Sequence, residues 1–371
     1  MIAAVTQRVQ RLDGTAVAHA ANRADMQRTS AEAEGPGLSL MDGDGASFGC
    51  QHPPVPRRTP TDRQSVRVRR LRARVGIITV AATRCSWHGP RLIGGAAENR
   101  YALRMADRTS ERHFPALAGV RVLVTGGTSG LGAAMVTALT GAGARVALTG
   151  RDEDRAVAAA ARHGAALGLG MDVRDEDSVE RGVERVIDRL GGLDVLVNNA
   201  GIGMRTVNPR FLTDPQPFWQ VGPDAFRDVV ATNFTGYHLV AREVVPRLLE
   251  AGGGRVVNVT ANHQTMARRG FAPYGPSRAG AEALSRVMAA DLAGSTVTVN
   301  LLLPGGATDT GMVPDDVPEQ ARRRLLSAEI MAAPIRWLCS PEAAGVHDQR
   351  IVATRFETWL AERAERCGRS E

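Results

Sequence analysis

The chain has 371 residues, of which 43% are hydrophobic and 4% aromatic, and a formal net charge of +7 at pH 7. That length accommodates one large domain, or one domain with an appendage. No apolar run approaches the roughly 18–20 residues that span a membrane, and the N-terminus lacks the basic and apolar stretches of a secretory signal, so we expect a cytoplasmic protein.

The positive charge is concentrated in the N-terminal third. Residues 1–104 contain 16 arginines and 8 acidic residues, a net charge of +8, whereas residues 105–371 come to about −1. The first segment mixes Gly, Pro, Ser and Arg with little apolar periodicity, so it has little surface to bury against the entropy of ordering. We predict an extension over 1–104, disordered or absent from the mature protein, followed by one folded domain over 105–371.

One arginine-rich run, RRTPTDRQSVRVRRLRARV at 57–75, has two interpretations. It contacts nucleic-acid phosphates, or it is a solvated arm. The lack of interleaved aromatic residues favours the arm, so we expect no nucleic-acid partner.

Two features of composition limit the available chemistry. The chain has no lysine, so all 46 basic residues are arginines. The cysteines Cys50, Cys85, Cys339 and Cys367 show no C-x-x-C spacing. This pattern fits a reducing compartment and predicts neither a disulfide framework nor a metal site.

From about residue 119, short apolar runs alternate with longer segments of helical periodicity. The predicted strands are RVLVTG, RVALTG, LGLGMDV, LDVLVNNAG, GRVVNVTA, VTVNLLLPG and RIVATRF. Helices are predicted at 130–142, 153–164, 175–190, 223–250, 275–293, 329–339 and the C-terminus. This alternation is typical of an α/β fold, a doubly wound parallel sheet of about seven strands with helices on both faces.

A glycine-rich turn, TGGTSGLG at 125–132, lies between a predicted strand and a predicted helix. Gly126, Gly130 and Gly132 follow the pattern G-x-x-x-G-x-G. The missing side chains permit a tight turn and let the backbone and the helix N-terminus approach a pyrophosphate. In a βαβ context the turn predicts a dinucleotide site.

Over residues 117–355 the sequence resembles the short-chain dehydrogenase/reductase family. The likeness rests on ordered motifs, namely the glycine-rich turn, NNAG at 198–201, Asn233, Tyr274 in YGPSR, and Pro304-Gly305. It implies a single Rossmann-type domain and an oxidoreductase that transfers hydride between a nicotinamide and an alcohol/carbonyl substrate. It also implies a homodimer or homotetramer that assembles through 223–250 and 275–293.

The end of the second predicted strand bears on the choice of nicotinamide. A carboxylate there binds a ribose 2′-hydroxyl and repels a 2′-phosphate. This chain has Gly150 at that place and then Arg151, which either pairs with a phosphate or is simply solvated. Asp152 and Asp154 soften the local charge, and Ser129 is not the basic residue of many NADP-dependent relatives. We predict NADP(H) in preference to NAD(H).

The resemblance implies that the cofactor is held at the carboxyl ends of the strands. Asp172 matches the acid beside the adenine ring, and Thr308 or Thr310 would hold the carboxamide, with Asp309 in the register of the family's threonine. The whole implied set is Thr125, Gly126, Ser129, Gly130, Leu131, Gly132, Arg151, Asp172, Val173, Asn199, Ala200, Gly201, Tyr274, Arg278, Pro304, Gly305 and Thr308.

The resemblance implies that Tyr274 exchanges a proton with the substrate oxygen. A tyrosine ordinarily titrates near pH 10, and a nearby cation favours its phenolate. The family's lysine, four residues further on, is replaced by Arg278, on the same face of the predicted helix. Arginine keeps the charge but is bulkier and does not titrate, so we predict partial replacement.

A second departure concerns the family's serine, which precedes the tyrosine and binds the substrate oxygen. Here Ala261 and Asn262 stand in that register, and an asparagine N–H can take such a role. Asn233 matches an asparagine whose kinked helix holds a proton-relay water. The implied catalytic set is Tyr274, Arg278, Asn233 and Asn262, with no metal.

These substitutions leave two hypotheses. The first is an NADP(H)-dependent oxidoreductase; the second is a nucleotide-binding but catalytically impaired member that acts as a sensor, scaffold or partner subunit. The substrate pocket is expected to be lined by 202–222, 263–273 and 306–325. Phe218 and Trp219 would be its apolar wall or core residues, and His347-Asp348 is expected to strain a turn.

Overall fold

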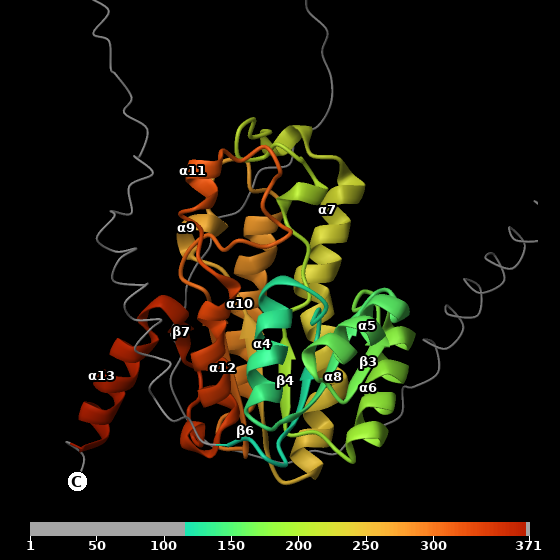
Figure 1. Cartoon of the computed structure of the whole chain (residues 1–371), viewed down its shortest axis with the longest axis vertical. Helices are drawn as coiled ribbons and strands as arrows, with labels where there is room; N and C mark the ends of the chain where they lie inside the picture. Colours follow the sequence, from blue (N-terminus) through green and yellow to red (C-terminus); the bar gives the residue numbers. More distant parts are fainter. Residues whose placement is uncertain (1–115, 369–371) are drawn as a thin grey trace, which may run out of the picture. The chain divides into compact units, whose positions relative to one another are not determined.

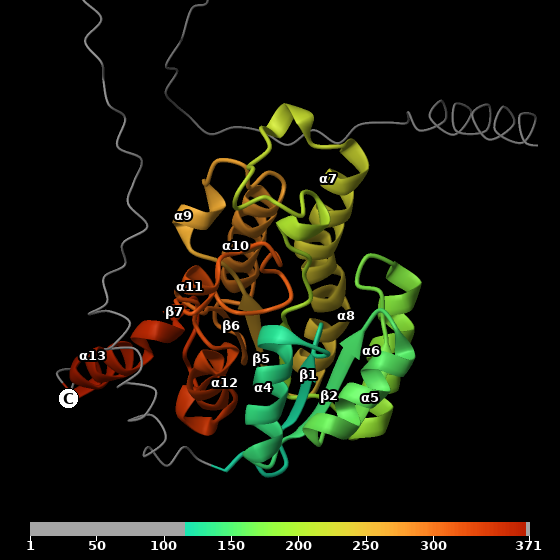
Figure 2. The same ribbon diagram turned by 45° about the horizontal axis from the view of Figure 1, so that its top comes forward.

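The computed structural model describes residues 116–368, with side chains up to 366. They form a parallel seven-stranded sheet in the order β3-β2-β1-β4-β5-β6-β7, flanked by helices (Figure 1; Figure 2). The predicted doubly wound α/β class is therefore confirmed. The extension 1–104, its arginine-rich run, Cys50 and Cys85 lie outside the described residues.

The strands and helices carry the labels of Figure 1. The strands are β1 (Arg121–Val124), β2 (Arg145–Gly150), β3 (Leu167–Gly170), β4 (Val195–Asn198), β5 (Gly254–Val259), β6 (Val297–Leu303) and β7 (Arg350–Val352). The helices are α4 (Gly130–Gly141), α5 (Glu153–His163), α6 (Glu176–Leu190), α7 (Pro223–Val230), α8 (Gly236–Glu250), α9 (His263–Met266), α10 (Tyr274–Asp291), α11 (Glu319–Arg322), α12 (Ala332–Cys339) and α13 (Phe356–Gly368).

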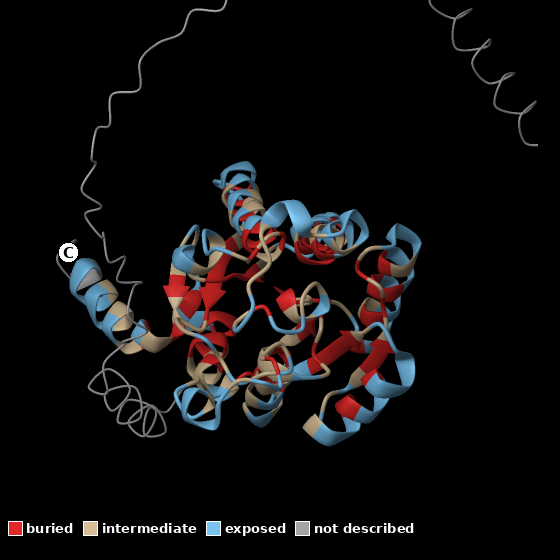
Figure 3. Cartoon of the chain, turned by 90° about the horizontal axis from the view of Figure 1, so that it is seen from above, coloured by how far each residue is buried: buried red, intermediate tan, exposed pale blue. Residues whose placement is uncertain are grey.

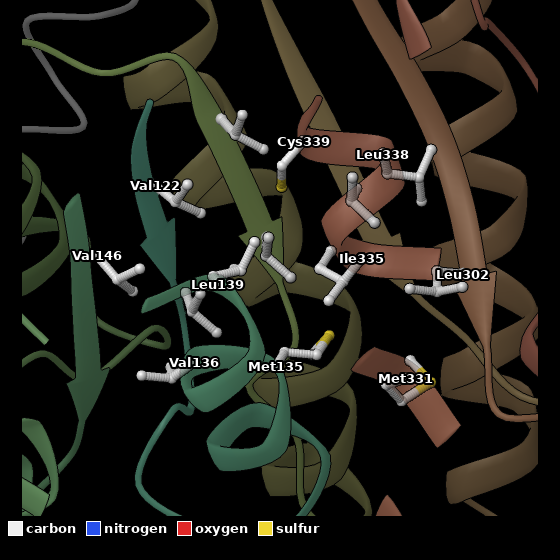
Figure 4. Packing of buried hydrophobic residues seen from close by; sticks show 14 of the residues in the cluster. Val122, Met135, Val136, Leu139, Val146, Leu302, Met331, Ile335, Leu338 and Cys339 are labelled. Carbon is white, nitrogen blue, oxygen red and sulfur yellow. The ribbon is translucent and has the colours of Figure 1, made fainter. Parts of the chain in front are cut away.

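Both faces of the sheet are covered, because successive strand residues point to opposite sides. In β1, Val122 and Val124 join a buried cluster with α4, α5 and α12, whereas Leu123 joins another with α6, α8 and α10. Figure 3 shows buried strands inside and exposed helix faces outside. Figure 4 shows the first cluster, where Met135 and Leu139 of α4 lie opposite Ile335 of α12.

The segment 223–250, predicted as one helix, is interrupted. The helices α7 and α8 are joined by a π-helical turn, Ala231–Thr235, that contains Asn233. Such turns are rare and are found mostly at functional sites. The interruption corrects the predicted single helix.

The strand order reverses between β1 and β4, which are neighbours although β2 and β3 lie between them in sequence. In open α/β sheets a ligand binds beyond the carboxyl ends of the strands at such a reversal. The residues after β1, β2, β4, β5 and β6 therefore meet at one edge of the sheet. No helix among residues 116–368 is long and apolar enough to cross a membrane.

Candidate active site

The glycine-rich turn between β1 and α4 is closed too tightly for side chains. Gly126 has a φ of +65°, and a Cβ there would lie 2.7 Å from the Ala200 Cα. A Cβ on Gly132 would lie 2.2 Å from the Gly126 carbonyl oxygen. A side chain on Gly126 would push the turn away from Ala200, and one on Gly132 would push it away from α4, so both glycines fix its shape.

The NNAG segment after β4 braces this turn. The Asn199 side-chain amide donates to the carbonyl oxygens of Thr125 and Gly126, both at 2.9 Å. The Thr125 hydroxyl accepts the backbone N–H groups of Asn199 at 3.0 Å and Ala200 at 3.1 Å.

The N-terminus of α4 opens beside the turn. Ser129 precedes α4, and its exposed side chain makes no capping hydrogen bond. The first N–H groups of a helix and its dipole favour an anion. The braced turn and this helix start therefore fit the diphosphate of a dinucleotide, as the sequence predicts.

At the end of β2, Thr128 leaves no room for the carboxylate side chain that would bind a ribose 2′-hydroxyl. A Cβ on Gly150 would lie 2.6 Å from the Thr128 methyl carbon. The next residue, Arg151, is exposed and makes no hydrogen bond or ion pair within residues 116–368. The Asp152 carboxylate caps α5 by accepting the Arg155 N–H at 2.8 Å, so it is engaged elsewhere.

Asp172, after β3, is held by Arg174. The guanidinium donates from Nε and Nη2 to both carboxylate oxygens, at 2.7–3.2 Å, and Nη1 reaches Asp228 at 3.1 Å. Hydrogen bonding to Arg174 lowers the pKa of the Asp172 carboxyl below its ordinary value. The acid predicted beside the adenine is therefore ionised and fixed in place.

Because the folded-state pKa of Asp172 is lowered, its ionised carboxylate stabilises the folded protein at pH values above its ordinary pKa of about 3.9. This contribution is lost as the pH falls through the lower folded-state pKa. We expect Arg174→Ala to cost about 1 kcal/mol of unfolding free energy at neutral pH, since the pair is partly exposed. The difference from wild type should shrink below about pH 4. Urea titrations across this range measure it, with Arg181→Ala, an exposed arginine of α6, as control. A loss independent of pH would contradict the assignment.

Tyr274 and Arg278 come together on α10, as their spacing predicts. Tyr274 begins the helix, and its ring packs edge-on against Phe271, with centroids 6.4 Å apart. Arg278 is only 4% exposed. Its guanidinium carbon lies 5.4 Å from the Tyr274 ring centroid, so a buried cation lies against the tyrosine.

A second tyrosine, which the sequence analysis missed, also contacts this cation. Arg278 Nη1 donates to the Tyr237 hydroxyl at 2.8 Å and to the Val259 carbonyl at 3.3 Å. Burial by itself lowers the pKa of Arg278, but Tyr237 and Tyr274 together raise it above its ordinary value, so the guanidinium is charged. Tyr237 follows Asn233 by four residues, a helical spacing that could have identified it.

Asn233 is fully buried and its side chain is saturated by hydrogen bonds. Its Oδ1 accepts the Ile202 N–H at 2.8 Å, and its Nδ2 donates to the Ile202 carbonyl at 2.9 Å and the Ser277 hydroxyl at 3.1 Å. It therefore ties the loop after β4 to the first turn of α10.

Asn262 lies between β5 and α9, and its side chain makes no hydrogen bond in the described part of the chain. Its neighbours are engaged: the Thr260 hydroxyl reaches Glu282 at 3.3 Å, and His263 Nε2 lies 3.1 Å from the same carboxylate. The Asn262 amide is thus free to donate a hydrogen bond to a ligand.

The segment after β6 closes over the glycine-rich turn. Gly305 has a φ of +99°, and a Cβ on Gly130 would lie 3.3 Å from the Thr310 methyl. Thr308 donates to the Gly306 carbonyl at 3.3 Å, and Asp309 pairs with Arg322 at 2.9 Å. Thr310, rather than Thr308, thus lies beside the turn.

The predicted pocket segment 202–222 contacts the other two, since Phe211 packs against Phe271 and the Thr213 hydroxyl donates to Asp316 at 2.7 Å. Met204, Phe211 and Phe271 form a buried cluster against which Tyr274 packs. Phe218 and Trp219 are 71% and 72% exposed, so their interpretation as core residues is wrong.

The turn before β7 has the expected strain. Asp348 has a φ of +55°, a backbone conformation that residues other than glycine rarely adopt. Its carbonyl and carboxylate both accept from Arg286 Nη1 at 2.5 Å. Cys339 is free and buried, and no cluster of metal-ligating side chains exists among residues 116–368.

Comparison with known proteins agrees with this geometry. The family model described as short chain dehydrogenase matches residues 120–321. A 3-oxoacyl-[acyl-carrier-protein] reductase of Vibrio harveyi is 31% identical over 243 residues, which cover 63% of this chain and 96% of that protein.

Two solved structures share the fold. A 3-ketoacyl-(acyl-carrier-protein) reductase from Brucella melitensis complexed with NADH has a TM-score of 0.57 and 28% identity, covering 64% of this chain and 97% of that one. A short chain dehydrogenase from Burkholderia cenocepacia in complex with NADP has a TM-score of 0.56 and 29% identity, with the same coverage. The chain therefore belongs to the short-chain dehydrogenase family and is an NAD(P)-binding oxidoreductase of the alcohol/carbonyl class.

Proposed function

We propose that the protein is an NADP(H)-dependent oxidoreductase that interconverts a carbonyl compound and its alcohol, with Tyr274 as the acid/base. The observation that carries the reaction is the buried guanidinium of Arg278, 5.4 Å from the Tyr274 ring centroid. A cation beside a tyrosine favours its phenolate. The impaired-protein alternative is not favoured, because the tyrosine, its cation and the dinucleotide turn occur together.

A nicotinamide dinucleotide held by the turn 125–132 and the segment 198–201 would supply hydride to the carbonyl carbon, or accept it from the alcohol carbon. In the reductive direction, the Tyr274 hydroxyl gives its proton to the carbonyl oxygen, and Arg278 stabilises the phenolate left behind. The free amide of Asn262 donates to the same oxygen as negative charge develops on it. In the oxidative direction the proton returns from the alcohol to Tyr274. Asn233 acts by holding the loop at Ile202 against α10.

The side chains around Tyr274 bear on the class of substrate. Met204, Phe211 and Phe271 offer an apolar wall beside Tyr274, which suits a substrate with an apolar portion. Arg268 lies over the Phe271 ring at 4.8 Å, and together with the exposed Arg269 it brings positive charge beside this cluster, which would suit a substrate with an acidic group. Assembly through 223–250 and 275–293 is supported by exposed apolar side chains there, Leu249 and Val287.

Arg151 is the residue that we propose binds the 2′-phosphate of NADP(H). We expect Arg151→Ala to weaken NADPH binding by about 10- to 100-fold, the loss of one charge-assisted hydrogen bond, and to leave NADH binding unchanged. Fluorescence titration of the full chain measures both constants. Arg155→Ala removes the same charge from an exposed position on α5 and serves as control. Equal losses for the two nucleotides would refute the assignment.

A further inference from the structure

Tyr237 is a buried polar residue with no part in the reaction as derived above. It is 1% exposed. Its hydroxyl donates to the Val259 carbonyl at 2.9 Å and accepts from Arg278 Nη1 at 2.8 Å. Its own carbonyl accepts from the Asn198 side chain at 3.3 Å. The bonds to Val259 and Asn198 therefore hold the hydroxyl and the backbone of Tyr237 in place independently of Arg278.

A buried arginine needs more acceptors than the side chains of α10 provide. Nη1 uses the Tyr237 hydroxyl and the Val259 carbonyl, while the guanidinium carbon lies 5.7 Å from the Tyr237 ring centroid. Nη2 occupies space that a side chain on Gly201 would fill, because a Cβ there would lie only 2.2 Å from it. The guanidinium thus lies against two phenol rings and a bare backbone.

One fully buried donor of this group has no partner. Arg278 Nε is buried and makes no hydrogen bond in the described part of the chain. A buried unsatisfied donor is costly, and such a group calls for a partner that the protein itself does not provide. An oxygen of the bound dinucleotide or substrate is a partner of the right chemistry.

We propose that Tyr237 is a positioning residue, which anchors Arg278 through Nη1 so that its remaining donors face the ligand and its charge stays beside Tyr274. This inference rests on the proposed function. An arginine is longer than a lysine and presents a rigid fork of donors. Anchoring one arm of that fork on Tyr237 sets the direction of the rest. A shorter ammonium would not need this anchor.

The test is a double-mutant cycle in the full chain with Tyr237→Phe, Arg278→Lys and both together. Titration with NADPH alone gives the affinity, and thermal unfolding without nucleotide gives the melting temperature. Tyr101→Phe, outside the described residues, is the control for loss of a phenol hydroxyl.

Tyr237→Phe should weaken NADPH binding about tenfold and lower the melting temperature when Arg278 is present, the loss of a hydrogen bond to a charged group. In the Arg278→Lys background it should change affinity less than about twofold. Equal effects of Tyr237→Phe in both backgrounds would overturn the proposal, because a purely structural tyrosine has no reason to depend on residue 278. Absence of NADPH binding by the wild-type chain would instead overturn the proposed function, and coupling in the melting temperature alone would then still support the anchoring of Arg278.

Discussion

Tyr274→Phe is expected to lower turnover by on the order of 10²–10⁴-fold, the usual contribution of a positioned general acid or base. Phenylalanine keeps the ring that packs against Phe271 and Arg278 but has no hydroxyl to exchange a proton. The measurement is the rate of NADPH oxidation with a carbonyl compound that the wild-type protein reduces.

One property of the Tyr274→Phe variant must stay at its wild-type value. This is the melting temperature, because the packing of the ring against Phe271 and Arg278 is retained. Turnover equal to that of the wild type would remove Tyr274 from the mechanism. Arg278, the buried cation beside it, would then have no catalytic role through Tyr274.

Asn262→Ala is expected to lower kcat by on the order of 10²–10³-fold, the typical loss when one oxyanion donor is removed. The amide makes no other hydrogen bond within residues 116–368, so its loss should leave the unfolding free energy nearly unchanged. Asn262→Ser restores a hydroxyl where the family has one and should recover part of the rate.

Gln264→Ala is the matched control for Asn262, since it removes an exposed amide from α9, the short helix that Asn262 precedes. It should leave kcat within about twofold of wild type, because Gln264 is exposed and has no assigned part in the reaction. Equal losses in the two variants would show that the loop, and not the Asn262 amide, matters.

The strands and most helix boundaries could be predicted because their signals are local. A parallel strand buried on both faces is a continuous apolar run, as VLV of β1 and VALT of β2 show. The helices α5 and α6 begin after aspartates that cap them and end before glycines in the left-handed conformation. The glycine-rich turn could also be predicted from the sequence, because a turn this tight requires glycine.

The contacts around Arg278 could not be predicted, because its partners are remote in sequence. Tyr237 lies 41 residues from Arg278, and only the fold brings its hydroxyl to the guanidinium. The π-helical turn was missed for a similar reason. Apolar periodicity describes 223–250 as one helix, whereas Asn233 bonds to Ile202, 31 residues away.

The exposed fraction of the aromatic side chains in 202–222 could not be predicted either. Large aromatic residues in a loop are as consistent with a core as with a surface, and composition alone does not distinguish the two. Phe218 and Trp219 pack edge-on against each other, with centroids 5.2 Å apart, and remain largely exposed. Only the path of the segment 202–222 decides this.

The most direct test of the account is a paired titration of the full wild-type chain with NADPH and NADH, which needs no knowledge of the substrate. The proposed function predicts saturable binding of NADPH and binding of NADH that is about tenfold weaker or more, because Arg151 pairs with the 2′-phosphate while Gly150 offers no acid to the 2′-hydroxyl. Equal affinities, tighter NADH binding or no binding of either nucleotide would contradict it.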